Sequence, residues 1–161
     1  MSPTPPPTCT AGCAGMADSA DKAADPAADR AGLVLCRADA LLDKGDAVVF
    51  DVVHRGLPVS AFVLRYEGRL VGYLNRCSHV AAEMDWLPGK FLDDEREYIL
   101  CAIHGAAYEP LSGACAGGPC GRSRLTPIAV GEVDGEVRWY PSADTQPRDA
   151  VPPGPAAESR P

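Results

Sequence analysis

Two short segments of this chain each hold a cysteine and a histidine close together: 77-CSH-79 and 101-CAIH-104. A metal centre needs ligands from separate segments that meet at one point, and thiolate and imidazole groups bind zinc and iron well. Residues 80–100 are enough for a loop and a returning strand, so the two segments can lie side by side. Of the three histidines in the chain, only His54 lies outside these segments. The sequence therefore predicts a fold built around a metal centre.

The residues around these segments add a family resemblance. The stretches 77-CSHVAAEMDW-86 and 101-CAIHGAAYEPLSGACAGGPC-120 resemble the two cluster-binding loops of Rieske iron–sulfur proteins. The resemblance is specific over roughly residues 70–125 and extends over roughly residues 32–140. It implies a Rieske-type [2Fe–2S] cluster as the cofactor.

In the ligand set that the resemblance implies, Cys77 and Cys101 bind one iron, and His79 and His104 bind the other. A structural zinc site is the alternative, because zinc also accepts two cysteines and two histidines. The usual zinc spacing places a cysteine pair first and a histidine pair later. Here each segment mixes the two ligand types, as one cluster with two chemically different irons requires. We therefore expect the cluster rather than zinc.

Residues next to the ligands are expected to shape the site and its reduction potential. Gly105 and the pair Gly118-Pro119 suit a tight loop folded over a buried cofactor. In quinol-oxidising Rieske proteins a disulfide joins the two loops and a serine and a tyrosine hydroxyl bond to cluster sulfurs. The residues at the corresponding positions of this chain are Ala82 and Ile103 for the disulfide, Ala106 for the serine, and Tyr108, which keeps its hydroxyl. The resemblance thus implies a potential in the lower half of the Rieske range of about −150 to +300 mV.

The chain has seven cysteines, and five are not assigned to the metal. Cys115 and Cys120 flank a tight Ala-Gly-Gly-Pro loop, where they can form a local disulfide or remain two packed thiols, and a reducing cytoplasm favours the thiols. Cys36 is expected to pack as a small apolar residue. Cys9 and Cys13 have no other ligand nearby, and the sequence assigns them no role.

Short strands and tight turns, with almost no helical periodicity, predict an all-β domain. The resemblance refines this prediction to the Rieske fold, in which small antiparallel sheets carry a cluster-binding subdomain at about residues 75–124. The domain is expected at 32–140, between disordered tails at 1–31 and 141–161. The predicted strands cover residues 32–37, 47–53, 60–66, 69–75, 97–101, 126–133 and 136–140, with a short helical turn at 38–42 and two-residue hairpin turns at Glu67-Gly68 and Asp134-Gly135.

Composition narrows the function. A net charge of −7 argues against a nucleic-acid partner. No stretch approaches 18 apolar residues, and the N-terminal residues lack the pattern of a secretory signal, so we expect a cytoplasmic protein without a membrane anchor. The acidic run Asp93-Asp94-Glu95 is expected to form a solvated loop tip. No nucleophile–base pair is evident, so no catalytic residue is predicted.

The function implied by the resemblance is one-electron transfer by a ferredoxin, between a reductase and an oxygenase or another redox enzyme. Two alternatives remain at this stage. One is a regulatory subunit whose cluster senses redox state, and the other is a zinc-stabilised interaction module.

Overall fold

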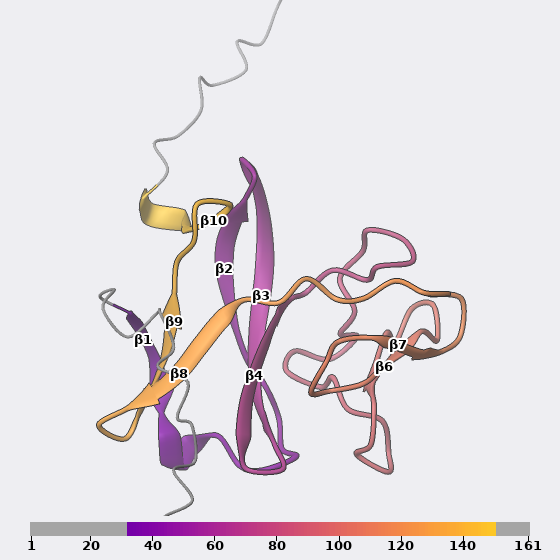
Figure 1. The fold of residues 1–161 in the computed structure, drawn as a ribbon, viewed down its shortest axis with the longest axis horizontal. Helices are drawn as coiled ribbons and strands as arrows, with labels where there is room; N and C mark the ends of the chain where they lie inside the picture. The colour runs from indigo at the N-terminus through magenta and orange to yellow at the C-terminus, as the bar shows by residue number, and fades with distance from the viewer. Residues whose placement is uncertain (1–31, 151–161) are drawn as a thin grey trace, which may run out of the picture.

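The computed structural model describes residues 32–150, and these residues form three small antiparallel sheets (Figure 1). The sheets have the strand orders β1-β9-β8, β10-β2-β3-β4 and β5-β6-β7. No α-helix occurs in this part of the chain, which confirms the all-β prediction. The elements are β1 (Leu33–Arg37), η1 (Ala38–Ala40), β2 (Val48–His54), β3 (Leu57–Tyr66), β4 (Arg69–Leu74), β5 (Ile99–Leu100), β6 (Ala107–Tyr108), β7 (Cys115–Gly117), β8 (Ala129–Val133), β9 (Glu136–Tyr140), β10 (Thr145–Pro147) and η2 (Arg148–Ala150), where η marks a 3₁₀ helix.

Strand β3 runs through the centre of the molecule and is buried on both faces. Successive side chains of a strand point to opposite faces, so Phe62 and Leu64 pack on one side and Ala61 and Val63 on the other. The first side meets the region that carries the predicted ligands, and the second meets the sheet β1-β9-β8. Burial on both faces explains why residues 60–64 form an almost continuous apolar run without polar alternation.

Three two-residue turns connect neighbouring strands. The predicted turns Glu67-Gly68 and Asp134-Gly135 have positive φ at both central residues, as a type I′ hairpin turn requires. A third turn of the same kind, Arg55-Gly56, joins β2 to β3. Because of this turn, β3 begins at Leu57, before the predicted start at residue 60.

The prediction that residues 141–161 are disordered is wrong for residues 141–150. Residues 145–147 form β10, which pairs with the free edge of β2. An edge strand leaves backbone N–H and C=O groups unpaired, and this pairing satisfies them. The His54 ring also lies 2.8 Å from the Thr145 hydroxyl, which places this histidine at the sheet edge. The rest of that predicted tail and the whole of the other, residues 1–31, lie outside the described residues, as do Cys9 and Cys13.

Residues 75–125 extend from the end of β4 as a separate lobe, seen beside β3 and β4 in Figure 1, and contain the sheet β5-β6-β7. We call this segment the cluster lobe. The lobe packs on β3 through the stacked rings of Phe62 and Phe91, whose centroids are 3.7 Å apart. The lobe is also bonded to β4, because the Tyr73 hydroxyl donates a hydrogen bond of 2.9 Å to the Pro110 carbonyl oxygen. The sheet β10-β2-β3-β4 therefore supports the lobe that holds both cysteine–histidine segments.

Candidate metal centre

The two cysteine–histidine segments are tight loops closed by their own backbone hydrogen bonds. The first follows β4, and the Cys77 N–H donates to the Ala82 carbonyl at 2.9 Å. The second follows β5, and the Cys101 N–H donates to the Ala106 carbonyl at 2.8 Å, while the Gly105 N–H returns to the Cys101 carbonyl at 2.8 Å. Each cysteine therefore lies at the closed base of its loop.

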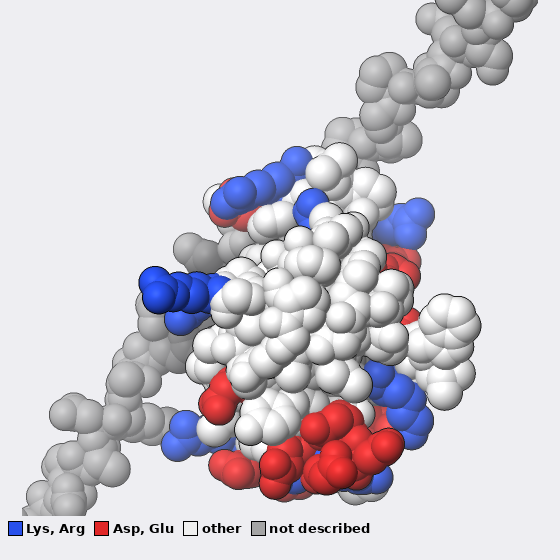
Figure 2. Space-filling model, turned by 90° about the vertical axis from the view of Figure 1, so that its right-hand side faces the viewer, with Lys and Arg blue, Asp and Glu red and all other residues white. Residues whose placement is uncertain are grey.

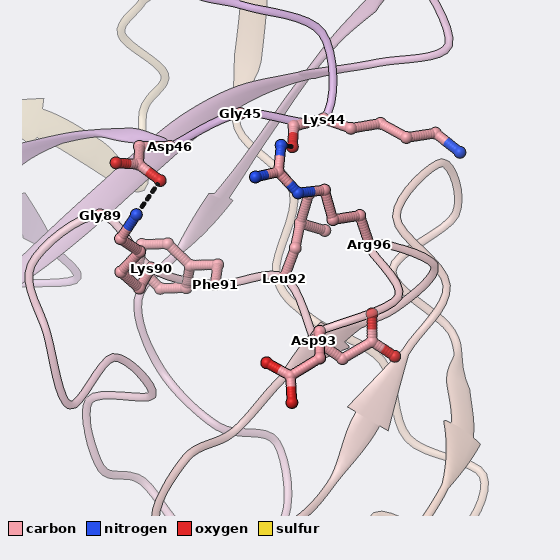
Figure 3. Close-up of a pocket in the computed structure, with 10 residues that line it drawn as sticks. Lys44, Gly45, Asp46, Gly89, Lys90, Phe91, Leu92, Asp93 and Arg96 are labelled. Atoms are coloured by element: carbon pink, nitrogen blue, oxygen red, sulfur yellow. Dashed lines mark hydrogen bonds and ion pairs between the residues drawn. The ribbon is translucent and has the colours of Figure 1, made fainter.

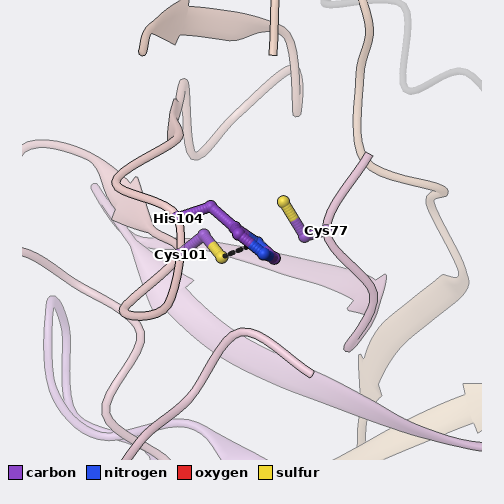
Figure 4. Close-up of side chains that lie close together, drawn as sticks. All are labelled: Cys77, Cys101 and His104. Carbon is purple, nitrogen blue, oxygen red and sulfur yellow. Dashed lines mark hydrogen bonds between the residues drawn. The ribbon is translucent and has the colours of Figure 1, made fainter. Parts of the chain in front are cut away.

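Three of the four predicted ligands converge on one point. The ligand atoms of Cys77, Cys101 and His104 all lie within 4.8 Å of one another, and Figure 4 shows the two thiols on either side of the imidazole ring. The distance from the Cys101 Sγ to the His104 Nδ1 is 3.5 Å. His79 lies outside this group of three, but its ring packs edge-on against the His104 ring, with 5.2 Å between centroids. The fold thus brings both loops together with their ligand side chains adjacent.

The two ligand types differ in exposure. Cys77 and Cys101 are 2% and 0% exposed, and both belong to the apolar core shared with β3 and β4. His104 is half-buried and His79 is exposed. The sulfur side of the site is therefore closed to water, while the imidazole side faces the solvent.

The backbone of each loop acts on the cysteine sulfur at its base. Hydrogen bonding from the backbone of His79 and Val80 lowers the pKa of the Cys77 thiol, and that from Ile103 and His104 acts in the same direction on the Cys101 thiol. Burial on its own raises the pKa of the Cys77 thiol, but the Tyr108 hydroxyl and these backbone groups lower it, and the resulting pKa is about 7. Burial raises the pKa of the Cys101 thiol. Because the thiolate is the form that binds metal, hydrogen bonds that stabilise it favour a metal site.

Tyr108 is fully buried next to the first loop. Its hydroxyl oxygen lies 3.2 Å from the Cys77 Sγ, and burial raises the pKa of this phenol. Ala106, which stands at the serine position of the pattern described above, is buried and offers only a methyl group. Ala82 and Ile103 have no thiol, so no disulfide can join the two loops at those positions. The site thus has one side-chain hydroxyl in contact with a cysteine sulfur.

The Gly118-Pro119 pair lies directly against the second loop. Gly118 has φ = +80°, and a Cβ atom at this position would overlap the Gly105 carbonyl oxygen and come within 3.0 Å of the Ala106 Cα. Only glycine permits this approach. The loop is closed by Cys115 and Cys120, which are joined by a disulfide with 5.8 Å between their Cα atoms.

Asn75 supports the first loop and was not singled out from the sequence. Its side chain is buried, and its Oδ1 accepts the Met84 N–H at 2.8 Å. Its Nδ2 donates to the Ser60 Oγ at 3.0 Å and to the Asp85 Oδ1 at 2.7 Å. One amide therefore ties the end of β4 to β3 and to the far side of the loop. In the sequence, only its position just before the ligand segment 77–79 could have indicated that it supports the site.

A surface pocket of about 300 Å³ lies away from the cysteines, between residues 44–46 and 89–96 (Figure 3). Most of its charged groups contact other groups of the protein: Lys90 pairs with Asp46 at 2.6 Å, and Arg96 donates to the Lys44 carbonyl at 2.8 Å. The Asp93 carboxylate accepts the N–H groups of the two residues after Arg96. We assign this pocket no chemistry. Asp93, the first residue of the acidic run that was expected to form a solvated loop tip, instead holds the backbone of its own turn.

The outer face of the cluster lobe is mostly uncharged. Figure 2 views the molecule from the lobe side, and acidic side chains gather along one edge of a broad neutral area. Exposed aliphatic residues adjoin both histidines: Val80 follows His79, and Ile103 precedes His104.

Within residues 32–150 there is no helix long and apolar enough to cross a membrane.

Comparison with known proteins identifies the fold. Residues 32–141 match the family model of the Rieske [2Fe–2S] domain. The ferredoxin of carbazole 1,9a-dioxygenase from Nocardioides aromaticivorans IC177 is similar in structure, with a TM-score of 0.54 and 23% identity, over 69% of this chain and 98% of that one. The Sphingomonas yanoikuyae B1 ferredoxin is similar at a TM-score of 0.50 and 22% identity, over 70% of this chain and 100% of that one. No curated protein matches by sequence.

Proposed function

Because the chain belongs to the Rieske [2Fe–2S] domain family, we propose that it is a one-electron carrier between a reductase and an oxygenase or another redox enzyme. The observation that supports this proposal most strongly is the orientation of the site. Its cysteines are buried in the core and its histidines lie on the solvent side. A carrier needs such an edge, since its partners must come close to the cofactor.

The cofactor of a Rieske domain is a [2Fe–2S] cluster, and the donor set described above fits it. Cys77 and Cys101 would hold one iron, and His79 and His104 the other. When bound, the cluster supplies one-electron redox chemistry. The family match does not support the zinc alternative.

The residues around the ligands have distinct roles in this proposal. The core around the two cysteines excludes water from the sulfur side. The Tyr108 hydroxyl lies 3.2 Å from the Cys77 sulfur. A sulfur bonded to iron can only accept, so Tyr108 would donate to it and stabilise added negative charge there. Val80 and Ile103 give the histidine edge an apolar surface that a partner protein can cover without stripping water from charged groups.

The nature of the partners is the less direct part of the proposal. Two of the structural relatives are named as ferredoxins. Another similar structure is a complex of reduced oxygenase and oxidised ferredoxin in carbazole 1,9a-dioxygenase. Its identity to this chain is 24%, and its TM-score is 0.50 over 67% of this chain and 91% of that one. These relatives support an oxygenase as acceptor. A redox-sensing regulatory subunit remains the alternative, and the cytoplasmic location stays a prediction.

The ligand assignment is tested by substitution. Cys77→Ala and His104→Ala are expected to lose the iron, the inorganic sulfide and the visible absorption of the cluster. Cys36→Ala provides a matched control, because Cys36 is a half-buried cysteine of β1 outside the site. A full complement of two irons in Cys77→Ala would contradict the assignment.

Electron carriage is tested separately. The purified protein is added to a ferredoxin reductase with NADH and cytochrome c as acceptor, and cytochrome c reduction is expected to depend on the added protein. A protein with an intact cluster that gives no such dependence, with several reductases, would favour the redox-sensing role instead.

A further inference from the structure

A second surface pocket, of about 310 Å³, lies beside the first ligand loop. Its walls come from segments far apart in the sequence: the end of β2 with the turn after it, the residues around the end of β4, the first ligand loop, and the stretch 124–126 that leads toward β8. Two of these segments are bonded directly, because the Leu74 N–H donates to the Thr126 carbonyl at 2.9 Å. The pocket is therefore a product of the fold, formed where the cluster lobe joins the central sheet.

The arginines in the walls of this pocket give it a single sign of charge. Arg55, Arg76 and Arg124 line it, and none of the described aspartates and glutamates does. The pocket between residues 44–46 and 89–96 is different, since its walls hold acidic as well as basic side chains. Such a concentration of positive charge stands out in a chain whose net charge is −7. The pocket therefore attracts anions.

Two of the three arginines are not neutralised by the part of the chain that the structure describes. Arg55 forms an ion pair with Asp144, at 3.6 Å. Arg76 and Arg124 form no ion pair with any residue of 32–150. A guanidinium group presents a planar fork of N–H donors, which matches two oxygens of a carboxylate or a phosphate. Arg76 and Arg124 are thus available for an anion.

His54, another residue of the wall, responds to the charge of these arginines. Burial is the main cause that lowers the pKa of His54, and the positive charges of Arg55 and Arg76 lower it further, against the opposing effect of Asp144. The lowered pKa favours the neutral ring. The positive charge of the pocket therefore comes from the arginines.

We propose that this pocket binds a small molecule with a phosphate or carboxylate group, held by Arg76 and Arg124. The size of the pocket favours a small ligand. Its volume of about 310 Å³ lies at the lower end of the range of about 300–1,000 Å³ that is usual for small-molecule sites. An extended acidic segment of a partner protein needs a longer surface than this.

The place of the pocket gives the bound anion an effect on the redox centre. Cys77 and Ser78 belong to its wall, so the anion lies next to the loop that holds a cluster ligand. Negative charge near the cluster disfavours the added electron, and the reduction potential is expected to fall when the pocket is filled. This part of the inference rests on the proposed function, because it needs Cys77 to be an iron ligand.

Binding is tested by isothermal titration calorimetry of the cluster-containing protein. Inorganic phosphate and citrate are titrated separately at an ionic strength held constant with chloride, and the tighter of the two identifies the preferred group. Arg76→Ala and Arg124→Ala are each expected to weaken binding about tenfold or more. Arg122→Ala is the matched control, because Arg122 is an exposed arginine of the same lobe that does not line the pocket, and it should leave the affinity nearly unchanged.

Three outcomes would overturn the proposal. The first is that neither phosphate nor citrate binds. The second is that Arg122→Ala weakens binding as much as Arg124→Ala, which would show a general effect of net charge. The third is that a polyglutamate peptide binds and neither small anion does, which would show a docking surface for an acidic protein. If Arg76→Ala does not retain its cluster, the comparison of Arg124→Ala with Arg122→Ala decides.

Voltammetry tests the effect on the redox centre. Saturating phosphate is expected to lower the reduction potential of the unsubstituted protein relative to chloride at equal ionic strength, and to leave that of Arg124→Ala unchanged. An unchanged potential in the unsubstituted protein would overturn this effect. Failure of the proposed function would look different, because the protein would then lack the spectrum of a Rieske cluster, whereas calorimetry would still detect the anion.

Discussion

Replacing Asn75 by alanine is expected to destabilise the first ligand loop. The Asn75 side chain is 3% exposed and makes three hydrogen bonds, to the Met84 N–H, the Ser60 hydroxyl and the Asp85 carboxylate. Alanine at this position removes all three hydrogen bonds at once. Met84 is fully buried, so water cannot replace the lost acceptor of its N–H.

The magnitude follows from the burial of each partner. A buried N–H without an acceptor costs about 1–3 kcal/mol. A hydrogen bond to a carboxylate contributes about 1.5–3 kcal/mol, but Asp85 is half-buried and regains part of this from water. The buried Ser60 hydroxyl keeps its hydrogen bond to the Glu83 carboxylate at 3.0 Å. The expected loss in the free energy of unfolding is about 2–4 kcal/mol, with faster loss of the cluster.

Urea unfolding of the cluster-containing protein measures this loss, followed by far-UV circular dichroism and by cluster absorbance. Ser112→Ala is a matched control, because Ser112 also accepts a backbone N–H, that of Ala114 at 3.2 Å, but at an exposed site. Its effect is expected to stay below about 0.5 kcal/mol. If Asn75→Ala were no more destabilising than this control, the buried amide would not hold the loop.

Three further outcomes are expected. Tyr108→Phe should lower the reduction potential from its starting value in the lower half of the range of about −150 to +300 mV, as measured by voltammetry, and a potential near the top of that range in the unsubstituted protein would refute the assignment of donors. Cys115 and Cys120 should both escape alkylation in native protein without reductant, and labelling of both would exclude a stable disulfide. Burial raises the pKa of Tyr73 to about 12, above the usual value of about 10, so this phenol should make the free energy of unfolding fall as the pH rises from about 10 toward 12. Tyr73→Phe should have a shallower fall over that interval, and equal slopes in the two proteins would contradict the burial argument.

The ligand segments and the hairpin turns could be read from the sequence because both are local signals. A cysteine and a histidine separated by one or two residues predict a metal-binding loop by their chemistry alone, and the structure places Cys77, Cys101 and His104 together. The turns Glu67-Gly68 and Asp134-Gly135 depend on backbone angles that glycine adopts without strain, and both are present in the structure. The apolar run at residues 60–64 predicted a strand, although it did not show that both faces of that strand are covered.

Contacts between distant polar residues were decided by the tertiary structure alone. Ser78 and Ser123 are 45 positions apart, and His54 and Thr145 are 91 apart, yet each pair is in contact. Serine, asparagine and threonine are common in loops, and nothing local distinguishes those that will be buried beside a partner. Their partners depend on how the cluster lobe packs on β3 and β4 and on which sheet edge is left open. Residues 145–147 pair with the free edge of β2. Their own sequence, Thr-Gln-Pro, has little tendency to form a strand.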